Sequence, residues 1–173
     1  MTMLYQLPPT VHQLLPDWRP GSVNPTEPLP RLTEDAILAA LASNKVALSI
    51  IHAAPSLKAG RYGMDWGSGG KFLFTRSQGL WTISSLLQYE VFAGGEKSDA
   101  TGPLDSLRRL MDLGRGLAGE NVPMLRQMPT SCSDKAFVAM QWLLRVWPVK
   151  DSDLKALQEE IAATSSSTDM RQD

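Results

Sequence analysis

Residues Leu80 to Leu117, LWTISSLLQYEVFAGGEKSDATGPLDSLRRLMDLGRGL, hold two amphipathic stretches separated by a glycine-containing polar turn. In the first stretch the spacing of the apolar residues predicts a helix over 80–92; they are Leu80, Ile83, Leu86, Leu87 and Val91. Gly94-Gly95 is expected to end this helix. Pro103 stands at the start of the second helix, where proline is favoured. The stretch therefore predicts an antiparallel helix hairpin.

Helical spacing also precedes the hairpin. Thr33 is the expected N-cap of an earlier helix, with acidic residues in its first turn. Ser43-Asn44 is expected to break or bend that element. Leu57–Gly79 is rich in glycine and predicts a long connection, in which Lys71–Thr75 has the composition of a short strand but no obvious partner strand.

After the hairpin, prolines divide the chain. Pro123 is expected to open a short helix through Met128, which Pro129 breaks or kinks. Ser133-Asp134 then caps a helix that runs to Trp147, and Asp151 caps a last helix. The longer of these helices carries an apolar side made of Phe137, Met140, Leu143, Leu144 and Trp147. No segment alternates with a sustained period of two, so the sequence predicts an all-α fold, a bundle of about six helices built from antiparallel pairs.

Three regions differ in composition. Residues 1–32 contain Pro8, Pro9, Pro16, Pro20, Pro25, Pro28 and Pro30, which predicts an extended arm because proline lacks an amide donor and fixes φ. The arm carries apolar side chains such as Tyr5 and Trp18, which either pack on the protein's own body or dock on a partner. Residues 33–163 are expected to form the helical domain, and residues 164–173 a flexible polar tail.

Charge and composition narrow the functional classes. The net charge is −1, so the chain lacks the basic excess of a general nucleic-acid binder or a polybasic membrane anchor. The longest apolar region, residues 36–54, is too short and too polar for a membrane span, and the N-terminus does not read as a signal peptide. Cys132 is the only cysteine, which excludes an intrachain disulfide and favours a cytoplasmic location. With His12 and His52 as the only histidines, we expect no metal site.

The segment Gly63–Lys71, GMDWGSGGK, is the strongest candidate for a phosphate-binding loop, and it does not fit one. Phe72 follows Gly70-Lys71 where the motif needs a hydroxyl residue, and Asp65 stands where it needs glycine. We therefore expect no nucleotide or other cofactor. Trp66 either anchors the loop on the helices or forms a recognition patch with Arg61 and Asp65.

Other reactive groups also lack the neighbours that catalysis needs. Ser68 does not stand in a nucleophile elbow, because Trp66 occupies the position of the first glycine. Cys132 follows a proline near a predicted helix start, and is expected to be half-buried and inert because no histidine is near in sequence. The sequence thus offers no catalytic residue.

The second helix of the hairpin combines paired charges with glycine. Asp105 with Arg109 and Arg108 with Asp112 are expected to form ion pairs between positions i and i+4 on an exposed face. Gly114, one of three glycines near the end of this helix, either weakens the last turns or lets another helix approach closely.

The hairpin Leu80–Leu117 resembles the helix pair of tetratricopeptide-type repeats. With the segments LASNKVALSIIHAA, RYGMDW and DSDLKALQEEI around it, the chain from Ala36 to Ile161 is similar to uncharacterised bacterial all-helical proteins built from such pairs. The repeat signature and its period of about 34 residues are not present. The resemblance implies a helical-pair scaffold that binds other proteins, and it carries over no catalytic residue.

Three functions remain open. The first is a non-enzymatic interaction or scaffold protein, which associates with a protein partner or with itself through its helix surfaces and its arm. The second is a small enzyme or ligand-binding protein with a pocket between helices, whose candidate polar groups are His52, Arg61, Tyr62, Asp65 and Glu90. The third is a subunit of a larger assembly. The candidate interaction residues are Tyr5, Trp18, Arg61, Asp65 and Trp66.

Overall fold

The computed structural model describes residues 27–53, 70–94, 101–118, 125–147 and 150–169. These residues form six helices, which are α2 (Arg31–Ser43), α3 (Lys45–Ala53), α4 (Gly70–Gly94), α5 (Thr101–Leu117), α6 (Met128–Val146) and α7 (Asp151–Asp169). No strand occurs within these ranges. The predicted all-α fold is therefore confirmed.

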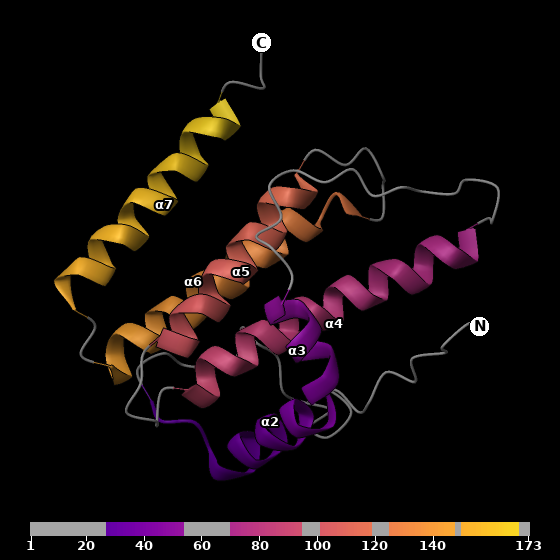
Figure 1. Ribbon diagram of the computed structural model, residues 1–173, viewed down its shortest axis with the longest axis horizontal. Coiled ribbons are helices and arrows are strands. Elements are labelled where there is room, and N and C mark those ends of the chain that lie inside the picture. Colours follow the sequence, from indigo (N-terminus) through magenta and orange to yellow (C-terminus); the bar gives the residue numbers. More distant parts are fainter. Residues whose placement is uncertain (1–26, 54–69, 95–100, 119–124, 148–149, 170–173) are drawn as a thin grey trace.

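Helices α4, α5 and α6 form a three-helix core in which each helix contacts the other two (Figure 1). Gly94 at the end of α4 lies against Pro103 in the first turn of α5, so these two helices form the predicted antiparallel hairpin. Gly114 in α5 lies against Cys132 in α6, and a Cβ atom at Gly114 would be 3.0 Å from the Cys132 Cβ. Because Gly114 has no side chain, α5 and α6 can approach closely. Of the two alternatives that the sequence left open for Gly114, this is the one that the structure shows.

Contacts between α4 and α6 show that these helices run in the same direction. Lys135 of α6 bonds to Ser84 and Ser85 of α4, and further along both helices the ring of Trp142 meets that of Phe92. The two ring centroids lie 5.6 Å apart at 75°, an edge-to-face arrangement that aromatic pairs favour. The largest side chains sealed inside the protein are Phe92, Ile37, Leu87, Leu107, Leu110, Met128 and Leu143.

Helices α2 and α3 form an elbow on the outside of this core. The predicted break at Ser43-Asn44 is confirmed, because the two helices meet there at 69°. Asn44 is buried, and its side-chain Nδ2 donates at 2.8 Å to the Ala40 carbonyl, which also accepts from the Asn44 backbone N–H at 3.2 Å, so Asn44 ends α2 with both groups. α2 packs on α4, whereas α3 buries only Leu48. α3 therefore lies against the protein with one narrow face.

The predicted N-cap at Thr33 is wrong. α2 begins at Arg31, and the carbonyl of Pro30 accepts from the backbone N–H groups of Thr33 at 2.9 Å and Glu34 at 3.0 Å. Pro30 has a φ of −58°, the value that its ring imposes, and so sets the chain up for a helix. Thr33 instead lies in the first turn of α2 with its side chain buried.

The predicted connection over Leu57–Gly79 ends earlier than expected, because α4 begins at Gly70. Lys71–Thr75 belongs to α4 and is not a strand. A strand needs a neighbour to take its backbone hydrogen bonds, whereas a helix satisfies them within the segment. The segment therefore joins the helix that follows it.

Pro129 does not break a helix but lies in the first turn of α6. A proline fits there because the first N–H groups of a helix have no partner inside the helix. Ser133 is consequently not a cap: it lies within α6, and its hydroxyl donates to the Pro129 carbonyl at 3.0 Å. The apolar side expected on this helix is also displaced, since Phe137 and Leu144 are 56 % and 43 % exposed.

The ends of the chain are described in part. Residues 1–26 of the predicted arm, including Tyr5 and Trp18, lie outside the described residues. α7 begins at Asp151, as expected to within one residue, and buries Leu157. This helix continues to Asp169 and so includes most of the segment assigned to the tail.

Candidate functional site

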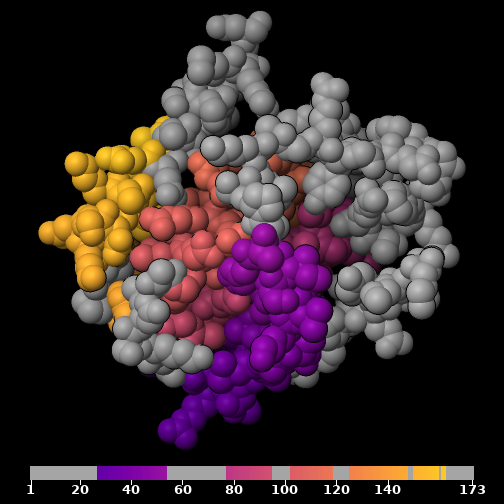
Figure 2. All heavy atoms as spheres, in the orientation of Figure 1, coloured from indigo at the N-terminus to yellow at the C-terminus, as the bar shows by residue number. Residues whose placement is uncertain are grey.

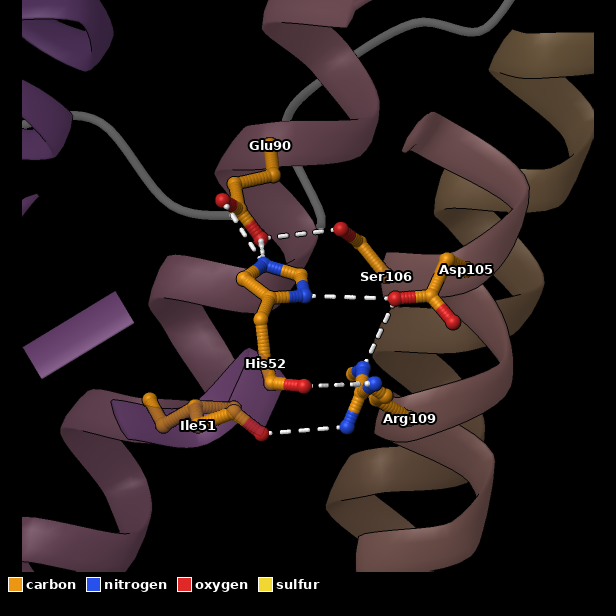
Figure 3. Close-up of polar contacts among 6 residues, drawn as sticks. All are labelled: Ile51, His52, Glu90, Asp105, Ser106 and Arg109. Atoms are coloured by element: carbon orange, nitrogen blue, oxygen red, sulfur yellow. Dashed lines mark hydrogen bonds and ion pairs between the residues drawn. The ribbon is translucent and has the colours of Figure 1, made fainter. Parts of the chain in front are cut away.

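The most connected group of polar side chains lies where the end of α3 meets α4 and α5 (Figure 3). His52, in the last turn of α3, points between the two core helices, toward Glu90 of α4 and Asp105 of α5. The side chains of His52 and Glu90 are 32 % and 22 % exposed, so the group is half-buried. Residues from three helices thus meet at one point of the surface.

Both ring nitrogens of His52 face a carboxylate. Nε2 lies 2.8 Å from Glu90 Oε2 and 3.1 Å from Glu90 Oε1, and Nδ1 lies 3.2 Å from Asp105 Oδ2. A neutral imidazole carries only one N–H, whereas the protonated ring carries two. Because an ionised carboxylate can only accept, the doubly protonated ring is the form of His52 that satisfies both contacts.

Arg109 joins the same group to the backbone of α3. Its Nε donates to Asp105 Oδ2 at 2.7 Å, while its two terminal nitrogens donate to the carbonyls of Ile51 and His52, each at 3.0 Å. The last carbonyls of a helix have no intrahelical partner and carry partial negative charge, so a guanidinium there caps and stabilises the helix end. Ser106 adds a hydrogen bond to Glu90 Oε2 at 2.8 Å.

The charges in this cluster, which we call the His52 cluster (His52, Glu90, Asp105, Ser106 and Arg109), balance one another. With the ring protonated, two positive groups face two carboxylates. Desolvation by burial acts to raise the pKa of Asp105, but the hydrogen bonds and charges of Arg109 and His52 outweigh it and hold that pKa below its ordinary value. The ionised form of Asp105 is therefore the stable one in the folded chain.

This geometry fits a structural tie between helices better than a reactive centre. Each nitrogen of His52 already faces a carboxylate, and the guanidinium of Arg109 is shared between a carboxylate and two carbonyls. Among the described residues no group of three His, Cys, Asp or Glu side chains is arranged to hold a metal ion.

The structure brings together only part of what the sequence suggested. His52 and Glu90, two of the five polar groups considered for a pocket between helices, are in contact. The other three, Arg61, Tyr62 and Asp65, lie outside the described residues, and so does Trp66. The ion pair of Asp105 with Arg109 is confirmed, but its face is half-buried rather than exposed.

Asp112 is found with a different partner. The expected partner was Arg108, but the described ion pair of Asp112 is with Arg115, at i+3. Cys132 is more deeply placed than expected, with no exposure at all, and burial raises the pKa of its thiol to about 11. Such a thiol stays protonated and unreactive at neutral pH.

A second feature lies on the opposite side of α3 from its buried residue. Val46 and Ile50 are one helical turn apart and are 73 % and 57 % exposed. Ser49 and Ala53 are exposed beside them, so the four residues form a stripe two turns long without a charge, which we call the α3 stripe. Figure 2 shows the α2–α3 segment on the surface of the molecule.

Comparisons with known proteins add no assignment. A search against protein-family models found no match, and searches of curated proteins and of solved structures found none either. Within the described ranges no single helix has the length and hydropathy of a membrane span, and α2 and α3 meet these criteria only when taken together across their 69° bend.

Proposed function

We propose that the protein is a non-enzymatic interaction module that associates with a second copy of itself through the α3 stripe. The observation that carries this proposal is the pairing of Val46 and Ile50, two large apolar side chains on one helix face that are both more than half exposed. Clustered apolar exposure of this kind is typical of protein contact surfaces, whereas single exposed apolar residues are common everywhere.

The composition of the α3 stripe favours a helix as its partner. Val46 and Ile50 alternate with Ser49 and Ala53, whose small side chains let another helix approach closely. The hydroxyl of Ser49 already donates to the Val46 carbonyl at 2.8 Å, so covering it with apolar atoms breaks no hydrogen bond to the protein. A helix with an apolar face is the element that such a stripe recognises.

The stripe is complementary to itself. If two copies pack α3 against α3 in antiparallel directions around a two-fold axis, the large residues of one copy lie over the small residues of the other. The net charge of −1 gives little long-range repulsion between copies. No charged side chain has to be desolvated on the stripe itself, since its members are Val46, Ser49, Ile50 and Ala53.

The His52 cluster supports this role from the other side of the helix. It fixes the end of α3 on α4 and α5 through side-chain and backbone contacts, so the stripe is presented on a held element. Two helical turns cover less area than a standard interface of roughly 1,600 Å². We therefore expect weak association, with a dissociation constant on the order of tens to hundreds of micromolar.

The test is the molar mass in solution as a function of protein concentration, by sedimentation equilibrium. The wild-type protein is expected to pass from monomer to dimer, and Ile50→Gln is expected to weaken the dimer by about tenfold, since it removes roughly 1–2 kcal/mol of apolar burial. Phe137→Gln is the matched control, because Phe137 on α6 is 56 % exposed, close to Ile50 at 57 %.

Two results would overturn the proposal. One is a protein that stays monomeric up to millimolar concentration. The other is a dimer that Phe137→Gln disrupts and Ile50→Gln does not, which would move the contact to α6. The urea midpoint of each variant is measured alongside, so that loss of folding is not taken for loss of contact.

A cytoplasmic location belongs to the same proposal, supported by a single cysteine that is sealed in the core and needs no oxidising environment. A contribution of the arm through Tyr5 and Trp18, and of the loop through Arg61, Asp65 and Trp66, remains a prediction from the sequence.

A further inference from the structure

Lys135 of α6 lies across two hydroxyl groups of α4. Its Nζ donates to Ser84 Oγ at 2.7 Å and to Ser85 Oγ at 2.9 Å. The same nitrogen stands 5.4 Å from the ring centroid of Trp81. In the part of the chain that the structure describes, no carboxylate forms an ion pair with Lys135. The described contacts of the amine are thus all with uncharged groups.

The hydroxyl groups are oriented to accept from the amine. Both donate their own hydrogen to the Trp81 carbonyl, from Ser84 at 2.8 Å and from Ser85 at 3.0 Å. Ser84 Oγ therefore offers its lone pairs to Lys135, and Ser85 Oγ accepts from Lys135 beside the hydrogen bond that it shares with the Tyr89 side chain. A neutral amine has two N–H bonds and one lone pair. Two acceptors match the two N–H bonds and leave the nitrogen lone pair without a hydrogen bond.

Burial favours this neutral amine. Burial lowers the pKa of Lys135 to about 8. At about pH 7.5, roughly one Lys135 side chain in four then carries the neutral amine, compared with roughly one in a thousand for an ordinary lysine. The backbone of Lys135 is fixed too, because buried Gln88 donates to its carbonyl at 3.2 Å.

We propose that Lys135 is an acylation site, which takes small acyl groups from activated esters and thioesters ahead of the other lysines. The lone pair of Nζ attacks the acyl carbon and forms a C–N bond, and the bond to the leaving alcohol or thiol breaks. One proton passes from the nitrogen to the leaving group or to water. The product is a neutral amide in the place of a buried cation.

The chemical class of the acyl group follows from the site. Lys135 is half-buried, so a small group such as acetyl fits better than a long chain. An amide suits surroundings without a counter-ion, because transferring a charge out of water is costly and the amide carries none. The hydroxyl of Ser84 does not receive the acyl group, since Ser84 is 0 % exposed and an acyl donor cannot reach it.

The test is competition among lysines of the native protein for a limiting amount of N-hydroxysuccinimide acetate near pH 7.5, read by peptide mass spectrometry. The comparison lysines are Lys45, Lys150 and Lys155, which are exposed. Lys135 is expected to react about tenfold faster than each of them. This tenfold difference in rate is smaller than the ratio between the neutral fractions of Lys135 and of an exposed lysine. The reason is that a less basic amine is a weaker nucleophile and that burial slows the approach of the reagent.

A pH series separates this chemistry from simple exposure. The rate at Lys135 is expected to level off above about pH 8, where its amine is mostly neutral, while the rate at the exposed lysines keeps rising. In concentrated guanidinium chloride the preference should vanish, because it depends on the fold. The proposal is overturned if native Lys135 reacts no faster than the exposed lysines, or if its rate rises with pH in parallel with theirs.

Discussion

His52 Nε2 lies 2.8 Å from Glu90 Oε2, although the two residues are 38 positions apart in the chain. This contact fixes the last turn of α3 on α4, and α3 contributes only Leu48 to the buried core. For so short a helix, polar contacts at one end are a large share of what holds it in place. The contact therefore links the position of the α3 stripe to the three-helix core.

The coupling energy between His52 and Glu90 can be measured with a double-mutant cycle. His52→Gln and Glu90→Gln keep the side-chain volume roughly constant and remove the imidazole or the carboxylate, and each is expected to lower the free energy of unfolding by about 1–2 kcal/mol. The double variant should lose less than the sum of the two, with a coupling of about 0.5–1.5 kcal/mol. Urea unfolding gives these values. Glu159→Gln, at an exposed position of α7, should change stability by less than about 0.5 kcal/mol.

Arg109→Lys tests the cap on α3. A lysine has one terminal nitrogen and cannot reach Asp105 and the carbonyls of Ile51 and His52 together, as the guanidinium does. Amide hydrogen exchange in α3 is expected to accelerate about tenfold or more, while exchange in the middle of α5 changes little. Arg126→Lys, at an exposed position before α6, is the control. Equal protection of α3 in both variants would contradict the capping role.

Asp105 gives the protein a specific acid sensitivity. Its pKa is lowered in the folded chain from the ordinary value of 3.8, so the unfolded chain takes up the proton first as the pH falls. The stabilisation is complete near neutral pH, begins to fade as the pH approaches 3.8, and is lost as the pH falls through the lower folded pKa. Asp105→Asn should therefore be less stable than wild type near pH 7, with a difference that shrinks under acid. Thermal unfolding between about pH 7 and pH 3 measures it, and a constant difference would count against the assignment.

Two glycines of the core helices make a matched pair. At Gly114 a new Cβ would meet the Cys132 Cβ at 3.0 Å, whereas at Gly79 it meets nothing within 4 Å. Gly114→Ala is expected to destabilise the protein by about 1–3 kcal/mol, because α5 and α6 must move apart. Gly79→Ala should stabilise it by about 0.5–1 kcal/mol through better helix propensity. The denaturant midpoints of both variants measure these changes in stability. The prediction is wrong if Gly114→Ala and Gly79→Ala change the stability in the same direction.

Lys135→Met is expected to raise stability. The folded pKa of Lys135 is about 8 and the ordinary value is 10.5, so between these pH values the unfolded chain holds a proton that the native chain has released. The cost of the buried cation is therefore largest below about pH 8 and fades as the pH rises toward 10.5. Near pH 7 the variant should be about 1–2 kcal/mol more stable than wild type.

The difference between wild type and Lys135→Met is the quantity to follow, because Cys132 and Tyr89 act in the opposite direction at high pH. Burial raises their pKa values to about 11 and about 12, so they lower stability as the unfolded chain loses their protons. The difference should shrink between about pH 7 and pH 10. A difference that stays constant over this range would show that Lys135 is an ordinary lysine.

The helices were predictable where spacing and chain-breaking residues agree. The hairpin of α4 and α5 and the break at Asn44 follow from local patterns alone. The errors occurred where one residue type has two uses. By sequence alone Pro129 and Ser133 fit a break and a cap, but proline also fits a first turn, and serine can bond to the carbonyl one turn back.

The candidate site was predictable only in fragments. His52 and Glu90 were singled out as polar residues, and Asp105 with Arg109 as a helix-surface pair, but no local pattern indicates that α3 docks on that surface. The sequence gives little indication of this docking, because Arg109 binds the backbone carbonyls of Ile51 and His52. Every residue has a backbone carbonyl, so no residue type marks the contact. The exposure of Phe137 was missed for a related reason: helical spacing defines a face but not which face is covered.

The arrangement of α4, α5 and α6 has a consequence for how the chain folds. α4 with α5, and α5 with α6, are neighbours in sequence, so the contacts of these two pairs close short loops, which is typical of rapid formation. Contacts between α4 and α6 close a longer loop, since Ser84 and Lys135 are 51 residues apart. α3 contributes only Leu48 to the buried core and reaches α5 across more than fifty residues, as from His52 to Asp105. In a newly synthesised chain α2 can therefore pack on α4 before α5 is made, whereas the end of α3 reaches Asp105 and Arg109 only after α5 has left the ribosome.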